Sequence, residues 1–138
     1  MTSVADTDAA VTDTHALLYH AGRSPRLGKR AAALFTRAEE RTAIVYVPAA
    51  VVWEVCLLAR AGRYNLRRAP RDFFDDLFTN PAYQPHDLTI AQMLDADELR
   101  INRDPFDALV CAAARELSLP LMTRDTAIEE SGAVTVLW

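Results

Sequence analysis

The sequence predicts an α/β domain of three layers, in which helices cover both faces of a mostly parallel sheet of five strands. Short apolar or β-branched segments alternate with longer segments whose apolar residues recur every three or four positions. Strands that are joined by crossover helices pair in parallel, and right-handed crossovers place helices on both faces of the sheet. With 138 residues, of which 51% are hydrophobic, the chain has the size of about one domain.

Five segments have the character of buried strands, because they are short, apolar or β-branched, and lack helical polarity. In chain order they are residues 10–12, residues 43–47, a short stretch near residues 88–89, residues 120–123 and residues 133–137. The acidic and polar residues 1–9 are expected to form a flexible tail, which leaves residues 10–138 as a single domain.

Helical segments occupy the intervals between these strands. Apolar residues line one helical face between residues 27 and 38, and again between residues 106 and 117. Pro48, Pro70 and Pro105 each stand where a first helical turn would begin, a position that needs no amide donor. No internal repeat, low-complexity tract or second domain is found in the sequence.

Four acidic residues stand where a strand or helix should close over the core. Asp13 follows the first strand, Asp125 follows the fourth, Glu54 is the only charge in an apolar stretch, and Asp107 lies near the start of an apolar helix. Burying a lone carboxylate costs several kcal/mol. Ligands of parallel sheets gather at the carboxyl ends of the strands, so the four acids are expected to line one site. Convergent carboxylates are typical of sites for hard divalent cations.

Three of these acids, and the nearby Asp104, also have structural explanations that the sequence leaves open. Asp104, before Pro105, is a strong N-cap signal, and Asp107 fits the third-position acid of a capping box. Asp125 can serve as a turn residue and Glu54 as an ordinary surface glutamate. If Asp107 belongs to the site, the partial positive charge at the helix N-terminus should favour its ionised form.

The net charge and the cysteine content bear on the partner and the cellular location of the protein. The formal net charge of −4 is unusual for a protein that binds nucleic acid. It is only weak evidence against such a partner, because carboxylates that hold a metal count in the net charge without facing the partner as free negative charge. Cys56 and Cys111 lie in apolar helical segments and are expected to be reduced thiols, which indicates a cytoplasmic protein. No apolar stretch approaches the ~18 residues that a membrane span needs.

Three ordered motifs resemble the PIN-domain ribonucleases, and among them the VapC-type toxins of bacterial toxin–antitoxin pairs. The motifs are VTDTHALLYH from Val11, VVWEVCLLARAGRYNL around Glu54, and RDPFDALVCAAARELSLPLMTRD from Arg103 to Asp125. A terminal strand that ends at Trp138 completes the pattern. The resemblance runs in the correct order over nearly the whole chain, leaving out the predicted tail, and it implies a three-layer PIN-like domain.

The resemblance implies a function and a set of site residues. Asp13, Glu54 and Asp107 correspond to the metal-binding acids of the family, and Asp125 to its more variable fourth acid. The polar residues expected to support them are Thr14, Thr123 and Asp104. The implied activity is a Mg²⁺- or Mn²⁺-dependent endoribonuclease that hydrolyses RNA with metal-activated water, held in check by a cognate antitoxin protein. The family usually forms homodimers.

Arginines after the Glu54 helix are candidates for binding the RNA substrate. They are Arg60, Arg63, Arg67, Arg68 and Arg71. Guanidinium groups match the geometry of phosphate oxygens. An arginine-rich segment is also typical of a solvated face, and an antitoxin contact is a third explanation.

Two other functions are compatible with parts of the pattern. A phosphoaspartate protein, either a receiver or a phosphatase, also places an aspartate after the first strand, but it needs a lysine near its site. The only lysine is Lys29, inside the second helix, which disfavours this class. A non-catalytic PIN-fold module that only binds RNA remains open, although all three main acids are present.

Overall fold

The computed structural model describes residues 7–138, in which five strands form one sheet. The strands are β1 (Ala9–Thr12), β2 (Ile44–Pro48), β3 (Tyr83–His86), β4 (Leu121–Met122) and β5 (Val136–Leu137). Their order across the sheet is β3-β2-β1-β4-β5, and every neighbouring pair is parallel. The predicted α/β fold is confirmed, and the sheet is parallel throughout.

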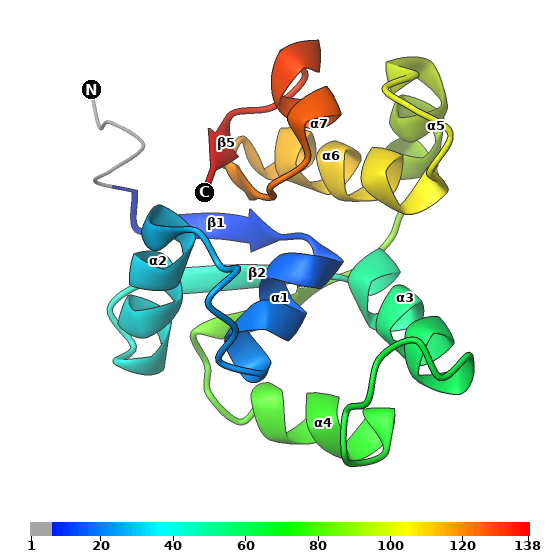
Figure 1. Ribbon diagram of the computed structural model, residues 1–138. Coiled ribbons are helices and arrows are strands. Elements are labelled where there is room, and N and C mark those ends of the chain that lie inside the picture. Colours follow the sequence, from blue (N-terminus) through cyan, green and yellow to red (C-terminus); the bar gives the residue numbers. More distant parts are fainter. Residues whose placement is uncertain (1–6) are drawn as a thin grey trace.

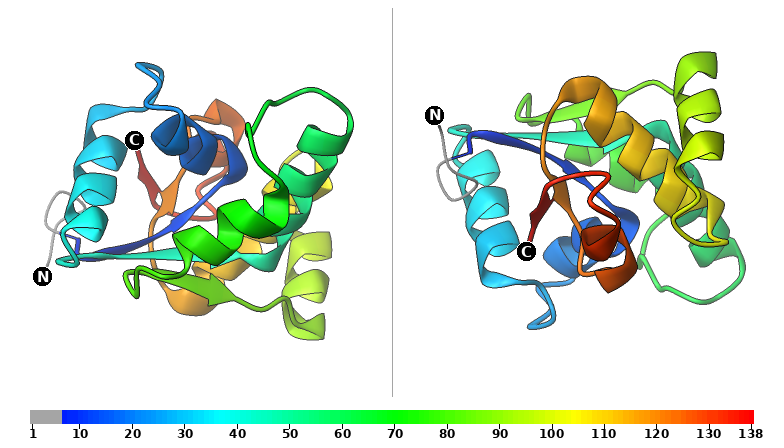
Figure 2. Two further views of the ribbon diagram at one scale, coloured as in Figure 1. Left: turned by 90° about the horizontal axis from the view of Figure 1, so that it is seen from below. Right: turned by 90° about the horizontal axis from the view of Figure 1, so that it is seen from above.

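Helices connect successive strands and cover the sheet. They are α1 (Thr14–Ala21), α2 (Lys29–Glu39), α3 (Ala49–Arg60), α4 (Pro70–Leu77), α5 (Ile90–Leu99), α6 (Pro105–Leu117) and α7 (Thr126–Ser131). The pair α5 and α6 lies on one side of β1 and β2, and α1 and α4 lie on the other (Figure 1). The view from below shows α4, in green, in front of the sheet, and the view from above shows α6, in yellow and orange, in front of it (Figure 2). Pro70 and Pro105 are the first residues of their helices, as predicted, whereas Pro48 is the last residue of β2 and the N-cap of α3.

The predicted strand near residues 88–89 is wrong. The third strand is β3, and Thr89 is instead the N-cap of α5, with its side chain accepting a hydrogen bond from the Gln92 amide at 3.1 Å. The sequence of β3, YQPH, lacks an apolar run because β3 is an edge strand. Edge strands are often polar and tolerate proline.

The described chain is already ordered where it enters β1. The Asp8 carbonyl accepts a hydrogen bond from the Ile44 amide at 2.8 Å, and Arg37 binds both the Thr7 carbonyl and the Asp8 carboxylate. β1 therefore begins at Ala9, one residue earlier than predicted. Residues 1–6 of the predicted tail lie outside the described residues.

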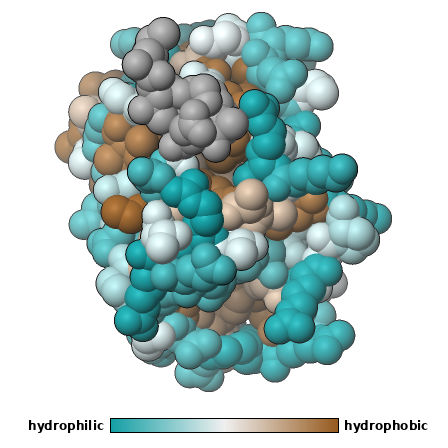
Figure 3. Space-filling view, turned by 90° about the vertical axis from the view of Figure 1, so that its left-hand side faces the viewer, coloured by the Kyte–Doolittle hydropathy of each residue, from teal (hydrophilic) through white to brown (hydrophobic). Residues whose placement is uncertain are grey.

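The core lies between the sheet and its helices. Val11, Val45 and Val47 on the central strands have no exposed surface, and neither have Leu17 and Phe35 on the helices that cover them. The outer surface seen from the side of the two chain ends is mostly hydrophilic, with small apolar patches (Figure 3). Cys56 and Cys111 are both free thiols, in agreement with the prediction. None of the helices between residues 7 and 138 has the length and hydrophobicity that a membrane crossing requires.

Candidate metal centre

The strand order creates a switch point between β1 and β4. From β1 the chain proceeds to β2 and β3 on one side and to β4 and β5 on the other, and ligands of α/β sheets bind beyond the carboxyl ends at such a point. Asp13 follows β1 there, and its amide donates to the Met122 carbonyl of β4 at 3.1 Å. Thr123 and Asp125 follow β4. The parallel pairing of β1 with β4 thus brings two distant acidic segments together.

Asp13 and Glu54 lie close to each other at this edge. Asp13 is the N-cap of α1, and its Oδ1 accepts a hydrogen bond from the Ala16 amide at 2.8 Å. The buried Thr14 hydroxyl donates to Glu54 Oε1 at 2.5 Å, which links α1 to α3. The negative charge of Glu54 contributes to raising the pKa of Asp13. Thr14 thus fixes the position of the Glu54 side chain near Asp13.

Asp107 and Asp125 form the second half of the cluster. Asp107 lies in the first turn of α6, and its Oδ2 accepts a hydrogen bond from Asn102 Nδ2 at 2.9 Å. Asp125 is the N-cap of α7, where its Oδ1 accepts from the Ala127 amide at 2.8 Å. Asp125 lies near enough to Asp107 that it adds to the effect of burial in raising the pKa of Asp107. The turn-capping role of Asp125 and its place in the cluster are therefore compatible.

Burial makes two of the carboxyl groups hard to ionise. It is the main reason why the pKa of Asp13 is raised, against the lowering effects of the Ala16 amide and the Thr123 hydroxyl. Burial also raises the pKa of Asp107 to about 7, with Asp104 and Asp125 adding to it and Asn102 opposing. Any favourable effect of the helix N-terminus on the ionised form of Asp107 is therefore outweighed by desolvation and by the neighbouring carboxylates.

The raised pKa of Cys111 also indicates that the acids lie close together. This buried thiol lies one helical turn after Asp107 on α6. Burial raises the pKa of Cys111 to about 12, and the charges of Asp107, Asp125 and Asp13 contribute in that order. Three of the four acids therefore surround one point in the core beneath the site.

The donor set fits a hard divalent cation in chemistry. It offers carboxylate and hydroxyl oxygens, and across residues 7–138 none of the four acids forms an ion pair with an arginine, lysine or histidine. In the same part of the chain, no three acidic, histidine or cysteine side chains are already arranged to hold an ion together. Each carboxylate is instead engaged by a local hydrogen-bond donor, so the side chains would have to turn toward an ion.

Comparison with protein families decides the identity of this fold. A PIN domain profile matches residues 10–133, which is most of the chain. The chain belongs to the PIN domain family. The resemblance that the three motifs carry is thereby confirmed, and the acids lie where the strand order of this PIN domain places its switch point.

Several solved structures have a similar fold, and one of them is a toxin–antitoxin complex. VapBC2 from Rickettsia felis, bound to a DNA fragment from its promoter, aligns with a TM-score of 0.66 and 13% identity, covering 93% of this chain and 96% of that chain. FitAcB from Neisseria gonorrhoeae aligns at 0.62 with 18% identity, covering 94% and 96%. A toxin–antitoxin complex from Klebsiella pneumoniae aligns at 0.60 with 19% identity, covering 94% and 96%. At these identities the likeness shows the fold. Comparison with curated proteins finds no match.

Asp104 is the N-cap of α6 in this PIN domain, as the sequence predicts. Its Oδ1 accepts a hydrogen bond from the Phe106 amide at 2.9 Å. Its own amide donates to Asn102 Oδ1 at 2.8 Å, so Asn102 joins the cap to Asp107. Asn102 was not among the residues predicted from the sequence. An asparagine two residues before an N-cap is a signal for a local side-chain turn, but only the structure shows that its amide group reaches a metal-centre acid.

Two substitutions at Asp104 should separate capping from chemistry. We expect Asp104→Asn to keep most of the stability and activity, because asparagine caps about as well as aspartate. Asp104→Ala should lower the free energy of unfolding by roughly 0.5 to 2 kcal/mol through loss of the cap. Urea unfolding and single-turnover RNA cleavage measure the two effects. If Asp104→Asn unfolds like the wild type but fails to cleave, Asp104 contributes to the metal centre directly.

Three of the five predicted RNA-binding arginines line one cavity of the PIN domain. The cavity, of about 520 Å³, lies between α3 and the loop to α4 and includes Arg60, Arg67 and Arg68. Arg68 also donates to the Asp72 carbonyl on α4 at 2.5 Å, so it is partly engaged within the fold. Arg63 and Arg71 are exposed outside this cavity. At 1.5 Å per helical residue, Arg60 lies about 9 Å along α3 from Glu54.

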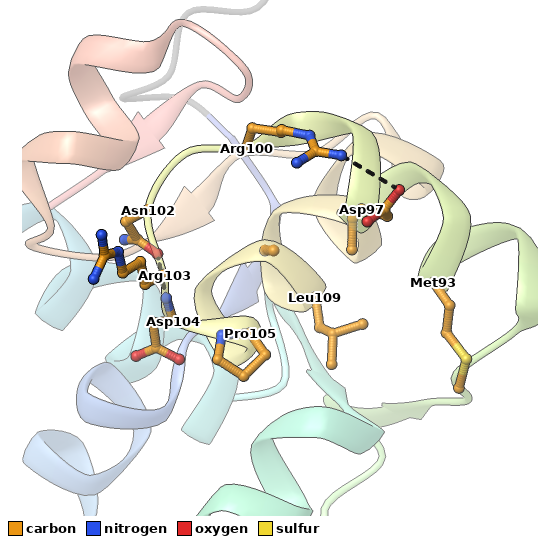
Figure 4. A pocket seen from close by; sticks show the side chains of 10 residues that line it. Met93, Asp97, Arg100, Asn102, Arg103, Asp104, Pro105 and Leu109 are labelled. Carbon is orange, nitrogen blue, oxygen red and sulfur yellow. Dashed lines mark hydrogen bonds and ion pairs between the residues drawn. The ribbon is translucent and has the colours of Figure 1, made fainter.

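A further cavity is lined by residues close to the candidate metal centre. It has a volume of about 490 Å³ and lies between α5 and α6. Asn102, Arg103 and Asp104 lie at one end of it, and Met93 at the other (Figure 4). The loop that carries Asn102 therefore separates this cavity from Asp107.

Proposed function

We propose that this PIN domain is a metal-dependent endoribonuclease and that it acts as the toxin of a toxin–antitoxin pair. The observation that carries the proposal is the convergence of four carboxylates at the switch point of the sheet, none of which forms an ion pair among residues 7–138. Such a cluster is unfavourable without a bound cation, since like charges repel and burial disfavours ionisation. Membership of the PIN family supports nuclease chemistry.

The residues of the site would have three roles: binding the metal ion, positioning Glu54 and keeping Asp13 charged. Asp13, Glu54 and Asp107 would hold Mg²⁺ or Mn²⁺, with Asp125 as the fourth acid. When bound, the cation would supply a Lewis acid that neutralises charge on the phosphate and activates water. Thr14 would keep Glu54 in place through its 2.5 Å hydrogen bond, and Thr123, whose hydroxyl lowers the pKa of Asp13, would help to keep that carboxylate charged.

RNA is the substrate that we assign to this centre. Hydrolysis by water would leave 5′-phosphate and 3′-hydroxyl ends. Arg60 and Arg67, which line the cavity at the end of α3, are placed to bind phosphates of a strand that extends away from the acids. Arg68 would contribute less, because it already donates to the Asp72 carbonyl.

An antitoxin protein is the partner that we propose. One of the similar structures is described as a toxin–antitoxin complex, and another is VapBC2 bound to a DNA fragment from its promoter. A segment with an arginine or lysine could enter the acidic centre and use the unneutralised carboxylates for affinity. We also propose that the protein is a homodimer and acts in the cytoplasm, where its two free cysteines would stay reduced.

Metal dependence is the direct test of the nuclease proposal. The purified protein should cleave single-stranded RNA in Mg²⁺ or Mn²⁺, lose this activity in excess EDTA and recover it when the metal is restored. Gel analysis of a 5′-labelled RNA measures the cleavage, and an identically purified Asp13→Asn preparation controls for contaminating nuclease. Undiminished cleavage in EDTA by the wild type alone would refute a metal mechanism.

The alternative of a non-catalytic module makes a different prediction in the same experiment. A PIN-fold protein that only binds RNA would retain the labelled RNA on a native gel but leave its length unchanged in either metal. This outcome would support RNA as the partner and would show that the protein is not a nuclease.

A further inference from the structure

Arg124 occupies an unusual place between two residues of the metal centre. It lies in the turn that joins β4 to α7, with Thr123 before it and Asp125 after it. Its side chain is exposed, and its Cζ lies 5.2 Å from the centre of the Tyr19 ring. A guanidinium at this distance over an aromatic face is attracted by the ring.

The aromatic ring beneath Arg124 is fixed in the core. Tyr19 is only 8% exposed, and its ring lies edge-on to Trp138, with 6.4 Å between the ring centres. The close approach of Gly28 to Trp138, where an added Cβ would lie 2.5 Å from the backbone, shows that this region is tightly packed. The Tyr19 ring therefore gives the guanidinium a rigid support.

The backbone of Arg124 is held equally firmly. Thr123 is fully buried, and its Oγ1 accepts a hydrogen bond from the Asp125 amide at 3.1 Å. Asp125 then caps α7 through the amides of Ala127 and Ile128. Both neighbours of Arg124 are thus locked by hydrogen bonds, and the position of its side chain relative to the acids follows from the fold.

Arg124 forms no ion pair among the described residues 7–138, whereas Arg37, Arg68, Arg100 and Arg115 each pair with an aspartate. Its guanidinium contacts the Tyr19 ring, and Asp125 follows it in the chain. A cation that is held over an aromatic ring next to two residues of the candidate centre, and is neutralised by no carboxylate, is available to an anionic ligand.

We infer that Arg124 is a substrate-binding residue that contacts a backbone phosphate of the RNA next to the one that is cleaved. The inference rests on the proposed ribonuclease function. An RNA strand that approaches four carboxylates is repelled by them, and a fixed guanidinium at the rim offsets this repulsion and matches phosphate oxygens with two parallel donors. The arginines after α3 lie on a different element and would bind the strand farther from the acids.

Equilibrium binding of a labelled single-stranded RNA in EDTA, over a range of KCl concentrations, tests this role without cleavage. Arg124→Gln should weaken binding and reduce the slope of log K against log salt by about 0.7, the value for one phosphate contact on a single strand. Arg124→Lys should restore the slope, because it restores the charge, but only part of the affinity. A purely structural role would leave the slope unchanged.

Arg41→Gln is the matched control, because Arg41 is an exposed arginine in the loop that enters β2 at the opposite edge of the sheet. It should leave affinity and slope unchanged. If the wild type binds and cleaves RNA but Arg124→Gln has the wild-type slope, the inference fails and the proposed function stands. The same holds if Arg124→Gln weakens only the binding of an antitoxin. If the wild type neither binds nor cleaves RNA, both are wrong.

Discussion

Asp107→Asn is expected to reduce metal-dependent RNA cleavage by more than about 100-fold, because loss of a residue that merely orients a metal ligand can already cost that much. Asparagine keeps the size of the side chain and can still accept the hydrogen bond from Asn102, but it lacks the charge that a divalent cation needs. Single-turnover cleavage in saturating Mn²⁺ measures the loss, and calorimetric titration with Mn²⁺ shows whether metal binding fails with it.

The same substitution should stabilise the metal-free protein at alkaline pH. The pKa of Asp107 is about 7 in the folded protein, against a reference value of 3.8. The folded state therefore binds the proton more tightly, and its stability falls as pH rises between these values. Removing the carboxyl group abolishes this loss. In EDTA, Asp107→Asn should melt at a higher temperature than the wild type at pH 8, with the difference shrinking toward pH 4.

Asp75→Asn is the control for this pair of measurements. Asp75 is an exposed aspartate on α4, away from the cluster, and surface substitutions of this kind change stability little. It should cleave RNA like the wild type and show no pH-dependent gain in melting temperature. If Asp107→Asn cleaves RNA as fast as the wild type, Asp107 is not a metal ligand. If cleavage is lost but the melting temperature at pH 8 does not rise, Asp107 can still be a metal ligand, but its ionisation does not destabilise the metal-free protein.

Growth arrest on expression is the second large effect that we expect. The chain expressed without its antitoxin should stop the growth of a bacterial host, and Asp13→Asn should abolish the arrest. Asparagine can still accept the hydrogen bond from the Ala16 amide that caps α1, so the fold should survive. Growth curves after induction, with the soluble protein quantified at each time, make the comparison.

Two controls show whether a loss of growth arrest is due to the missing Asp13 carboxylate. Asp75→Asn should remain toxic at equal protein levels, which excludes a general effect of losing an aspartate. The Asp13→Asn protein should melt cooperatively, which excludes loss by unfolding. Harmless accumulation of folded wild-type protein would contradict the toxin role while leaving the nuclease activity to be judged by cleavage in vitro.

The features that could be predicted from the sequence depend on the periodicity of apolar residues and on near neighbours in the chain. Asp13 and Asp125 follow strands whose apolar character is plain, and the parallel pairing of β1 with β4 brings them together as the strand rules require. Glu54 stood out because its neighbours are apolar. The N-cap at Asp104 was readable from the proline that follows it.

What the sequence could not provide depends on contacts between distant segments. The edge strand β3 has no apolar run to mark it. Asn102 becomes relevant only because its amide group reaches Asp107, and Arg124 only because Tyr19 from α1 lies beneath it. The raised pKa of Asp107 arises from burial and from charges on two other segments, so the local helix terminus was a poor guide to it.

The central position of β1 has a consequence for synthesis on the ribosome. Its neighbours in the sheet are β2, which follows soon in the chain, and β4, which is translated much later. Domains generally acquire structure from the N-terminal side as the chain emerges, and pairings between distant segments form slowly. Until Leu121–Met122 has left the exit tunnel, the nascent chain lacks both Asp125 and the strand that seats it beside Asp13. The acids of the candidate metal centre can therefore come together only when translation of the chain is nearly complete.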